Sequence, residues 1–326
     1  MQSDVQKFGL IPETPDPRDF SQEKVFGAIS LTDVPNGDFF VSDPIKIKNQ
    51  GGTDFCVGFA AAAVVEDHEH TELSGPFLYS AAKKLITETS GNSEEWRKWG
   101  LQIRDVCNVL IKVGALEEDL SPFKGETSDY LRDDLANPKN WGEDYEMLAA
   151  EHRQSSYFNV DGPHDTFDNF RAALWRGKQS GGSILTGVLW RYSWSQAPGG
   201  IIPKDYDATE GGEPHALKIF GQMLVKLHEH DQYGCLEDGS CDIPESEELM
   251  LVAQLSNGED IGDKGLFYLP RNVVNKEFVY GAKQFSDMPK GEAKTYMEHG
   301  LKVNDGRFYK LAVVALHWLL ASAGLR

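Results

Sequence analysis

Apolar residues recur at helical spacing through the N-terminal half of the chain. Between residues 103 and 111 they stand at positions i, i+4, i+7 and i+8, which predicts a helix with one buried face. The segment Phe77–Ile86 has similar spacing, and the alanines and valines of residues 60–65 are compatible with a further helix. Gly114 is placed to end the helix over residues 103–111. The buried face of that helix would consist of Ile103, Cys107, Leu110 and Ile111.

The pattern changes in the second half of the chain. The stretch from about Gly125 to Tyr157 is polar and rich in Asp, Glu and Asn, and we interpret it as loop and short helix between two halves. Phe167–Gly177 is predicted to be helical. Two apolar runs, Ser183–Leu189 and Ala216–Phe220, are typical of strands.

The C-terminal stretch Phe308–Leu325 is strongly apolar and is predicted to form a helix. Its length is at the short end for a membrane span, it contains Lys310 and His317, and it lacks a basic flanking pattern. We therefore expect this helix to pack on the domain or to be buried in a homo- or hetero-oligomer. A transmembrane anchor is the alternative.

Composition and charge narrow the class of protein. The chain has 326 residues, 40% hydrophobic and 25% charged, which is ordinary for a soluble globular protein. A net charge of −19 argues against a nucleic-acid-binding protein and favours cationic partners. The first ten residues lack the apolar core of a signal peptide, so we expect a cytoplasmic location. Four cysteines are too few for a disulfide scaffold.

The stretch Ile47–Glu66 carries the clearest chemistry. A Gln–Gly–Gly turn leads to Cys56, which follows Gln50 by six positions and opens the small-residue helix. A cysteine in the first turn of a helix lies near unpaired backbone N–H groups, which favour the thiolate. The amide of Gln50 could donate a hydrogen bond to an oxyanion formed beside that sulfur. The alternative is a structural cysteine buried behind a glycine turn.

This stretch resembles the active-site segment of the papain-like cysteine peptidases, in which a Gln and a Gly-rich turn precede the nucleophilic cysteine. Two further segments resemble the bacterial and phage branch of that family. One is the proline-rich, extended segment Gly9–Phe20, and the other runs from Gly100 to Phe123. The residues that carry these two matches are Asp16, Pro17, Arg18, Asp19, Gly100, Ile103, Arg104, Asp105, Gly114, Pro122 and Phe123.

The resemblance continues at His215, which a glycine-rich loop delivers to the start of an apolar strand, with Pro214 in place of the usual Gly or Asn. His215 follows Cys56 by 159 positions, slightly more than the roughly 130–150 typical of papain-like enzymes. Near the family's Asn motif the chain departs from the pattern. Leu255 stands where the orienting Asn is expected, and Asn257 could replace it only if the loop is shifted by two residues.

The resemblance implies an α+β papain-like two-lobed fold, with a helical lobe, a β-barrel-like lobe and the active-site cleft between them. The implied organisation is an extended arm over residues 1–40, a helical lobe over 41–150, a β-rich lobe over 151–290 and a C-terminal extension over 291–326. The family's longer helical pro-segment does not precede Cys56, so we expect no latency from a pro-domain.

The resemblance implies hydrolysis of peptide bonds through a thioester on Cys56, with His215 as general base and acid and Gln50 as oxyanion donor. An ion pair with His215 would keep the thiol of Cys56 ionised. Asp54 and Phe55 stand where the family usually has Gly and Ser, and a carboxylate pointing inward would oppose thiolate formation. The alternative function is a weakly active or inactive papain-fold binding or structural protein, for example in a phage particle.

One insertion offers potential metal ligands. His228, His230, Cys235 and Cys241 lie close together in a turn-rich segment. Two His and two Cys could bind zinc tetrahedrally, although their spacing matches no common zinc pattern. A hairpin with a cysteine pair is the simpler interpretation, and we expect no cofactor.

Overall fold

The computed structural model describes residues 9–13, 16, 19–43, 46–124, 126–142, 144–178, 182–227 and 246–286. All of them lie in one compact unit, which spans residues 1–287. The histidine and cysteine cluster of the insertion and the apolar stretch Phe308–Leu325 lie outside the described residues. Among the residues that the structure describes, every helix is too short or too polar to span a membrane.

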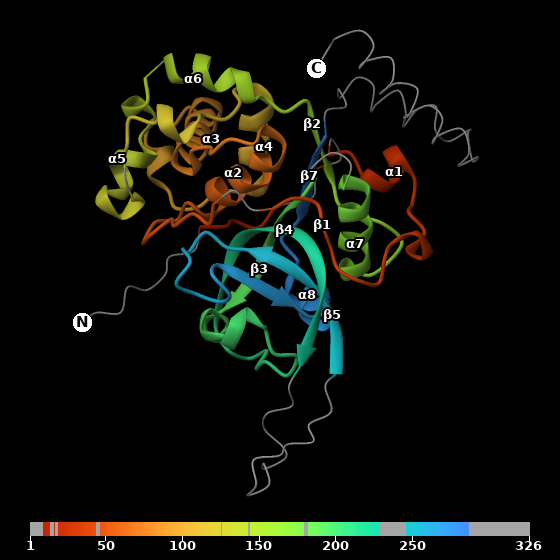
Figure 1. The fold of residues 1–326 in the computed structure, drawn as a ribbon. Coiled ribbons are helices and arrows are strands. Elements are labelled where there is room, and N and C mark those ends of the chain that lie inside the picture. The colour runs from red at the N-terminus through yellow and green to blue at the C-terminus, as the bar shows by residue number, and fades with distance from the viewer. Residues whose placement is uncertain are drawn as a thin grey trace, which may run out of the picture. The chain divides into compact units, whose positions relative to one another are not determined.

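The helices of the first half gather on one side of the unit, as the spacing of apolar residues predicts (Figure 1). They are α2 (Cys56–Glu69), α3 (Gly75–Ser90), α4 (Ile103–Lys112), α5 (Arg132–Ala136) and α6 (Asp144–Ala149). Helix α2 is buried over most of its length. Its small residues let α3 approach closely, because a Cβ on Gly58 would lie 2.4 Å from the carbonyl oxygen of Gly75. Gly114 has φ +108° directly after α4, as predicted for a helix end.

The second half is built on one antiparallel sheet. Its strands are β1 (Phe39–Phe40), β2 (Ser156–Asn159), β3 (Ile184–Arg191), β4 (Gly212–Leu227), β5 (Ser246–Gln254), β6 (Leu266–Leu269) and β7 (Ala282–Ser286). The strand order is β2-β7-β3-β4-β5-β6, and β1 pairs with β4. The described strands thus form an open sheet, so the expected barrel-like closure is wrong.

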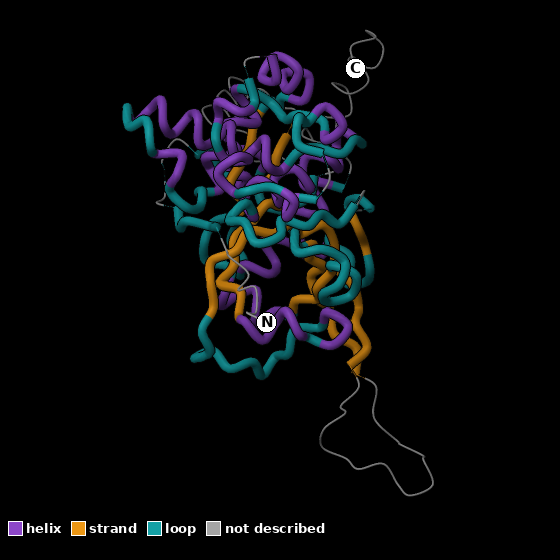
Figure 2. Tube along the Cα trace, turned by 90° about the vertical axis from the view of Figure 1, so that its left-hand side faces the viewer, coloured by secondary structure: helices purple, strands orange, loops and turns teal. Residues whose placement is uncertain are grey.

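Two hydrophobic cores correspond to the two halves. One is formed mainly by α2, α3 and α4, and the other by the sheet together with α7 (Thr166–Gly177) and α8 (Arg271–Glu277). We call these halves the helical lobe and the sheet lobe, and Figure 2 shows helices gathered at one end and strands at the other. The predicted helix over 167–177 and strand over 183–189 are confirmed as α7 and β3.

The N-terminal segment differs in part from its expected form. Residues 22–26 form helix α1 (Gln22–Phe26), which Ser21 caps, so that part of the predicted arm is not extended. The strand around His215 is also longer than predicted, because β4 begins at Gly212 and pairs His215 with Val188 of β3. His215 therefore lies inside a strand and not before one.

Candidate active site

Cys56 in the helical lobe and His215 in the sheet lobe lie near one another. Cys56 is the first residue of α2, after Phe55 at the N-cap. Backbone hydrogen bonds to its sulfur come from Ala216, Gly9 and Val57. Because Ala216 directly follows His215 on β4, the nucleophile candidate lies against the strand that carries the base candidate.

Burial decides the charge state of both groups. The Cys56 side chain has no exposed surface, and this burial raises the pKa of its thiol to about 11, with a smaller contribution from the Asp54 charge. Burial likewise lowers the pKa of His215 to about 3, although the nearby Asn257 side chain acts in the opposite direction. At neutral pH this structure therefore favours a neutral thiol and a neutral imidazole. The expected ion pair is not the form that this buried arrangement stabilises.

Gln50 is held in a defined orientation beside the start of α2. Its amide nitrogen donates to the carbonyl oxygen of Thr53 at 2.8 Å, and its amide oxygen accepts from the hydroxyl of Ser256 at 2.6 Å. The backbone N–H of Gln50 also donates to the carbonyl of Ser256 at 2.8 Å. Ser256 follows β5 in the sheet lobe, so both lobes fix this side chain.

The structure brings Asn257, and not Leu255, to His215. The side chain of Asn257 lies close enough to the imidazole to raise its pKa, whereas Leu255 is buried in the core of the sheet lobe. Residues 256–258 run along the segment before Cys56, where Asn49 pairs with Asn257. This pairing places Asn257 beside the imidazole.

A short N-terminal segment lies against Cys56, and we call it the strap (Gly9–Glu13). The Leu101 N–H donates to the carbonyl of Gly9 at 2.8 Å, and the Ile11 N–H donates to the carbonyl of Leu101 at 2.8 Å. A Cβ on Gly9 would lie 1.8 Å from the carbonyl oxygen of Asp54, so only glycine fits there. The strap thus runs between the two lobes (Figure 1), and its Gly9 backbone contacts the fully buried sulfur of Cys56.

The side chain of Leu10 inserts between the lobes. Leu10 is buried within the core of the helical lobe and lies against Gly187 of β3, where an added Cβ would be 2.4 Å from its Cδ2 atom. Beyond the strap, charged groups anchor the chain. Arg104 Nη2 lies 2.7 Å from an Asp19 carboxylate oxygen, and Lys283 Nζ lies 2.7 Å from Asp19 and 3.2 Å from Glu13.

This anchor involves two segments singled out by the sequence. Asp19 belongs to the Pro-Asp-x-Arg-Asp pattern and Arg104 to the pattern on α4. Burial alone would raise the pKa of Asp19, but hydrogen bonds from Arg104 and Lys283 outweigh burial and lower it. The two motifs therefore contact one another and hold the strap near Cys56.

Other sequence candidates have simpler positions. Cys107 is buried in the core of the helical lobe, as predicted. Phe55 does not crowd a cleft, because its ring stacks on Tyr79 at a centroid distance of 4.1 Å. Within the described ranges, no group of three or more His, Cys, Asp or Glu side chains could hold a metal ion.

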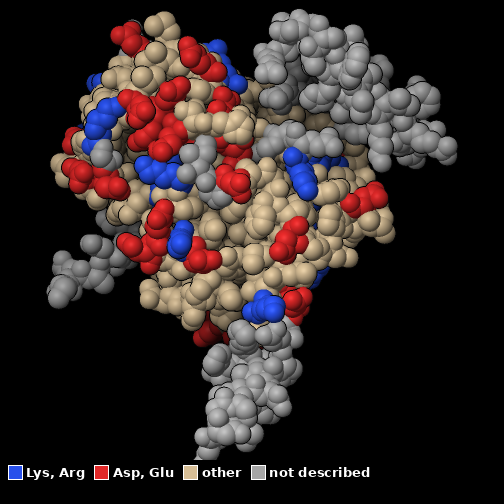
Figure 3. Space-filling model, in the orientation of Figure 1, with Lys and Arg blue, Asp and Glu red and all other residues tan. Residues whose placement is uncertain are grey.

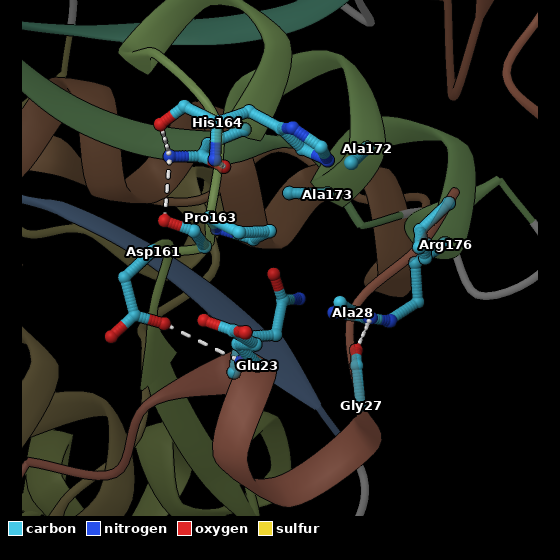
Figure 4. Close-up of a pocket in the computed structure, with 13 residues that line it drawn as sticks. Glu23, Gly27, Ala28, Asp161, Pro163, His164, Ala172, Ala173 and Arg176 are labelled. Atoms are coloured by element: carbon cyan, nitrogen blue, oxygen red, sulfur yellow. Dashed lines mark hydrogen bonds between the residues drawn. The ribbon is translucent and has the colours of Figure 1, made fainter. Parts of the chain in front are cut away.

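A hollow lies between α1 and α7, away from Cys56 (Figure 4). Asp161 accepts hydrogen bonds there from the Ser21 hydroxyl and the Glu23 N–H, and Arg176 donates to the carbonyl of Gly27 at 2.5 Å. These polar groups tie α1 to the sheet lobe. Elsewhere on the surface, acidic side chains gather over the helical lobe (Figure 3).

Two sequence comparisons found nothing, since no known family profile and no curated protein matches the chain. Comparison of structures does define the fold, which is that of the papain-like cysteine proteases. The chain is similar to xylellain, a cysteine protease from Xylella fastidiosa, with a TM-score of 0.60 and 20% identity over 86% of this chain and 96% of that one.

Two other proteases have the same fold at lower similarity. Procathepsin B from Trypanosoma congolense has a TM-score of 0.53 and 12% identity, covering 89% of this chain and 85% of that one. Bromelain from Ananas comosus, solved with the inhibitor E64, has a TM-score of 0.50 and 14% identity, covering 78% and 99%. The α+β papain-like prediction is thus confirmed.

Sequence reasoning missed the strap and the partner of Gln50. Gly9 and Leu10 open the segment Gly9–Phe20, which the sequence predicted to be extended, but nothing in it indicated a contact with Leu101 about ninety positions away. The one available signal was a glycine between apolar residues. Ser256 stands next to Leu255 and Asn257, and its hydroxyl was the available signal for a hydrogen bond to Gln50.

Proposed function

We propose that the chain is a cysteine peptidase of papain-like fold whose cleft is closed by its own strap. The observation that supports this most is the set of fixed contacts around Cys56. Ala216 reaches its sulfur from β4, Asn257 lies beside His215, and Ser256 orients Gln50. A nucleophile, a base with an orienting group, and an oxyanion donor are the parts that acyl transfer needs.

The proposed reaction requires the strap to move. Once water enters, the pKa of Cys56 falls and that of His215 rises, because desolvation is the largest cause of both shifts. The sulfur then attacks the peptide carbonyl carbon, and His215 transfers the proton to the leaving amine. Gln50 and the Cys56 N–H stabilise the oxyanion. Water cleaves the thioester, which releases the acid and restores the thiol.

A second function is an inactive papain-fold binding protein. The complete burial of Cys56 and His215 favours it, because neither group is charged or accessible while the strap is closed. Displacing the strap would expose a reactive Cys56 in a peptidase, but an unreactive one in the binding protein.

The test uses Gly9→Ala to displace the strap and measures hydrolysis of denatured casein together with intact mass after an epoxysuccinyl inhibitor. A peptidase would hydrolyse casein and gain one adduct, and both would vanish in Gly9→Ala/Cys56→Ala. Loss of the adduct in Gly9→Ala/His215→Ala would identify the base. A folded Gly9→Ala protein that neither hydrolyses casein nor gains an adduct would overturn the peptidase function and favour the inactive papain-fold protein.

A further inference from the structure

Asp54, two residues before Cys56, has a fully buried carboxylate with several hydrogen bonds. It accepts from the hydroxyl of Tyr79, from the Gly100 N–H at 2.6 Å and from Arg132 Nε at 3.0 Å. These contacts draw the carboxylate toward the loop before α4. A buried ion pair of this kind contributes little to stability compared with apolar side chains of the same size.

The neighbouring side chains of Lys83 and Arg132 hold the backbone carbonyl groups of the same loop, residues 98–100. Lys83 Nζ donates to the carbonyls of Lys98 and Gly100, both at 2.6 Å. Arg132 donates to the carbonyl of Lys98 at 3.1 Å. Gly100 has φ +77°, a conformation that side chains rarely adopt, so the loop has a specific shape that these contacts fix.

The fixed loop ends at Leu101, which offers a backbone edge to an extended chain. Its N–H and its carbonyl both pair with the strap, at Gly9 and Ile11 respectively. The strap therefore demonstrates that a peptide backbone binds along this edge beside Cys56. A shift of Gly100 would move the edge, because the two residues are adjacent.

We propose that Asp54 is a positioning residue, which holds Gly100 so that the Leu101 edge has the geometry that binds a peptide backbone. The strap occupies the edge in the closed form, and an extended peptide substrate would occupy it in the open form. The substrate part of this inference rests on the proposed function. The part that concerns the strap rests on the observed hydrogen bonds alone.

The first test is hydrogen exchange in the full chain, which needs no catalysis. Asp54→Ala removes the acceptor of the Gly100 N–H, whereas Asp54→Asn keeps one oxygen for it. We expect the Leu101 and Ile11 amides to exchange on the order of tenfold faster in Asp54→Ala, and less so in Asp54→Asn, because one charge-assisted hydrogen bond is lost. Tyr79→Phe removes one partner of Asp54 and is the milder variant should Asp54→Ala fail to fold.

Asp168→Asn provides a matched control. Asp168 is another mostly buried carboxylate, and its arginine partners are Arg171 at 2.9 Å and Arg271 at 2.8 Å in the sheet lobe. Its loss should lower stability without a selective effect at Leu101 and Ile11. Equal exchange at these two amides in the Asp54, Tyr79 and Asp168 variants would overturn the proposal and leave Asp54 with a structural role only.

A second readout addresses the substrate. In a Gly9→Ala background, Asp54→Ala should raise KM for a peptide substrate on the order of tenfold with a smaller change in kcat, because the edge binds substrate and does not react. A fall in kcat with unchanged KM would contradict this role. If Gly9→Ala hydrolyses no peptide, the proposed function fails, and the exchange measurement still decides whether Asp54 positions the edge.

Discussion

Replacing Gly9 by alanine should open the strap without disturbing the rest of the fold. The added Cβ would lie 1.8 Å from the carbonyl oxygen of Asp54 and 2.5 Å from its carbonyl carbon, so the closed position is no longer possible. Gly9 does not have a left-handed backbone, so alanine brings no conformational strain of its own. The change therefore acts through this collision.

Two independent arguments give the expected gain in Cys56 reactivity when the strap opens. Closure buries Leu10, which contributes about 2 kcal/mol, and forms two backbone hydrogen bonds, which contribute about 1 kcal/mol each. The conformational entropy lost on ordering three residues opposes closure by about 1 kcal/mol per residue. The net is ~1 kcal/mol, and opening by this route gives about fivefold more open form. Independently, burial raises the pKa of Cys56 from 9.0 to about 11, and two pKa units correspond to about a hundredfold less thiolate at neutral pH.

We therefore expect Cys56 in Gly9→Ala to react with iodoacetamide at pH 7 roughly fivefold to a hundredfold faster than in the wild type, because the thiolate is the reacting form. Peptide mass mapping reports each cysteine separately, and the buried Cys107 serves as internal reference. Gly37→Ala is the matched control, because an added Cβ at Gly37 meets nothing within 4 Å. Equal rates at Cys56 in all three proteins would refute the view that the strap controls access and ionisation.

Three further predictions concern the site and its support. The closed form should lose about 1.4 kcal/mol of stability per pH unit as pH falls from 6.5 toward about 3, because burial keeps His215 neutral while the open form binds a proton. Proteolysis of the strap should therefore be faster at pH 5 than at pH 7. The substitution His215→Phe should abolish this difference. Asn257→Ala should lower kcat of the opened enzyme at least about tenfold. Leu255→Ala should retain kcat but lower the free energy of unfolding in urea by about 2–5 kcal/mol. Equal kcat values for the two variants would contradict this assignment. Asp67→Ala should destabilise the fold by about 3–5 kcal/mol in urea unfolding, because it leaves the buried ammonium of Lys218 without its partner; an unchanged midpoint would show that the pair is dispensable.

Local patterns predicted the parts of the site that lie close in sequence. The helix after Cys56 is visible because small apolar residues form a continuous block, and the turn at Gln50 is visible because of its two glycines. His215 was found through its resemblance to a family motif, since a single histidine in an apolar strand carries no chemical signal of its own.

The strap and the position of Asn257 could not be predicted in this way. Strap formation depends on pairing between Ile11 and Leu101, and neither residue has a local feature that indicates a partner. A motif frame places Leu255 opposite the imidazole only if the loop after β5 is regular. The observed loop follows the segment before Cys56 through the Gly258 N–H and the carbonyl of Lys48, which brings Asn257 there instead.

The closed form masks the site without dismantling it. The contacts of Ser256 with Gln50 and of Asn257 with His215 are made within and between the lobes, and neither involves the strap. Displacing the strap removes one N–H from the sulfur of Cys56 but leaves the one from Ala216. Because burial causes the largest part of both pKa shifts, hydration moves the thiol and the imidazole toward an ion pair at the same time as it admits a substrate. We infer that access and ionisation change together, so a partly displaced strap should raise both reactivity and hydrolysis in the same proportion.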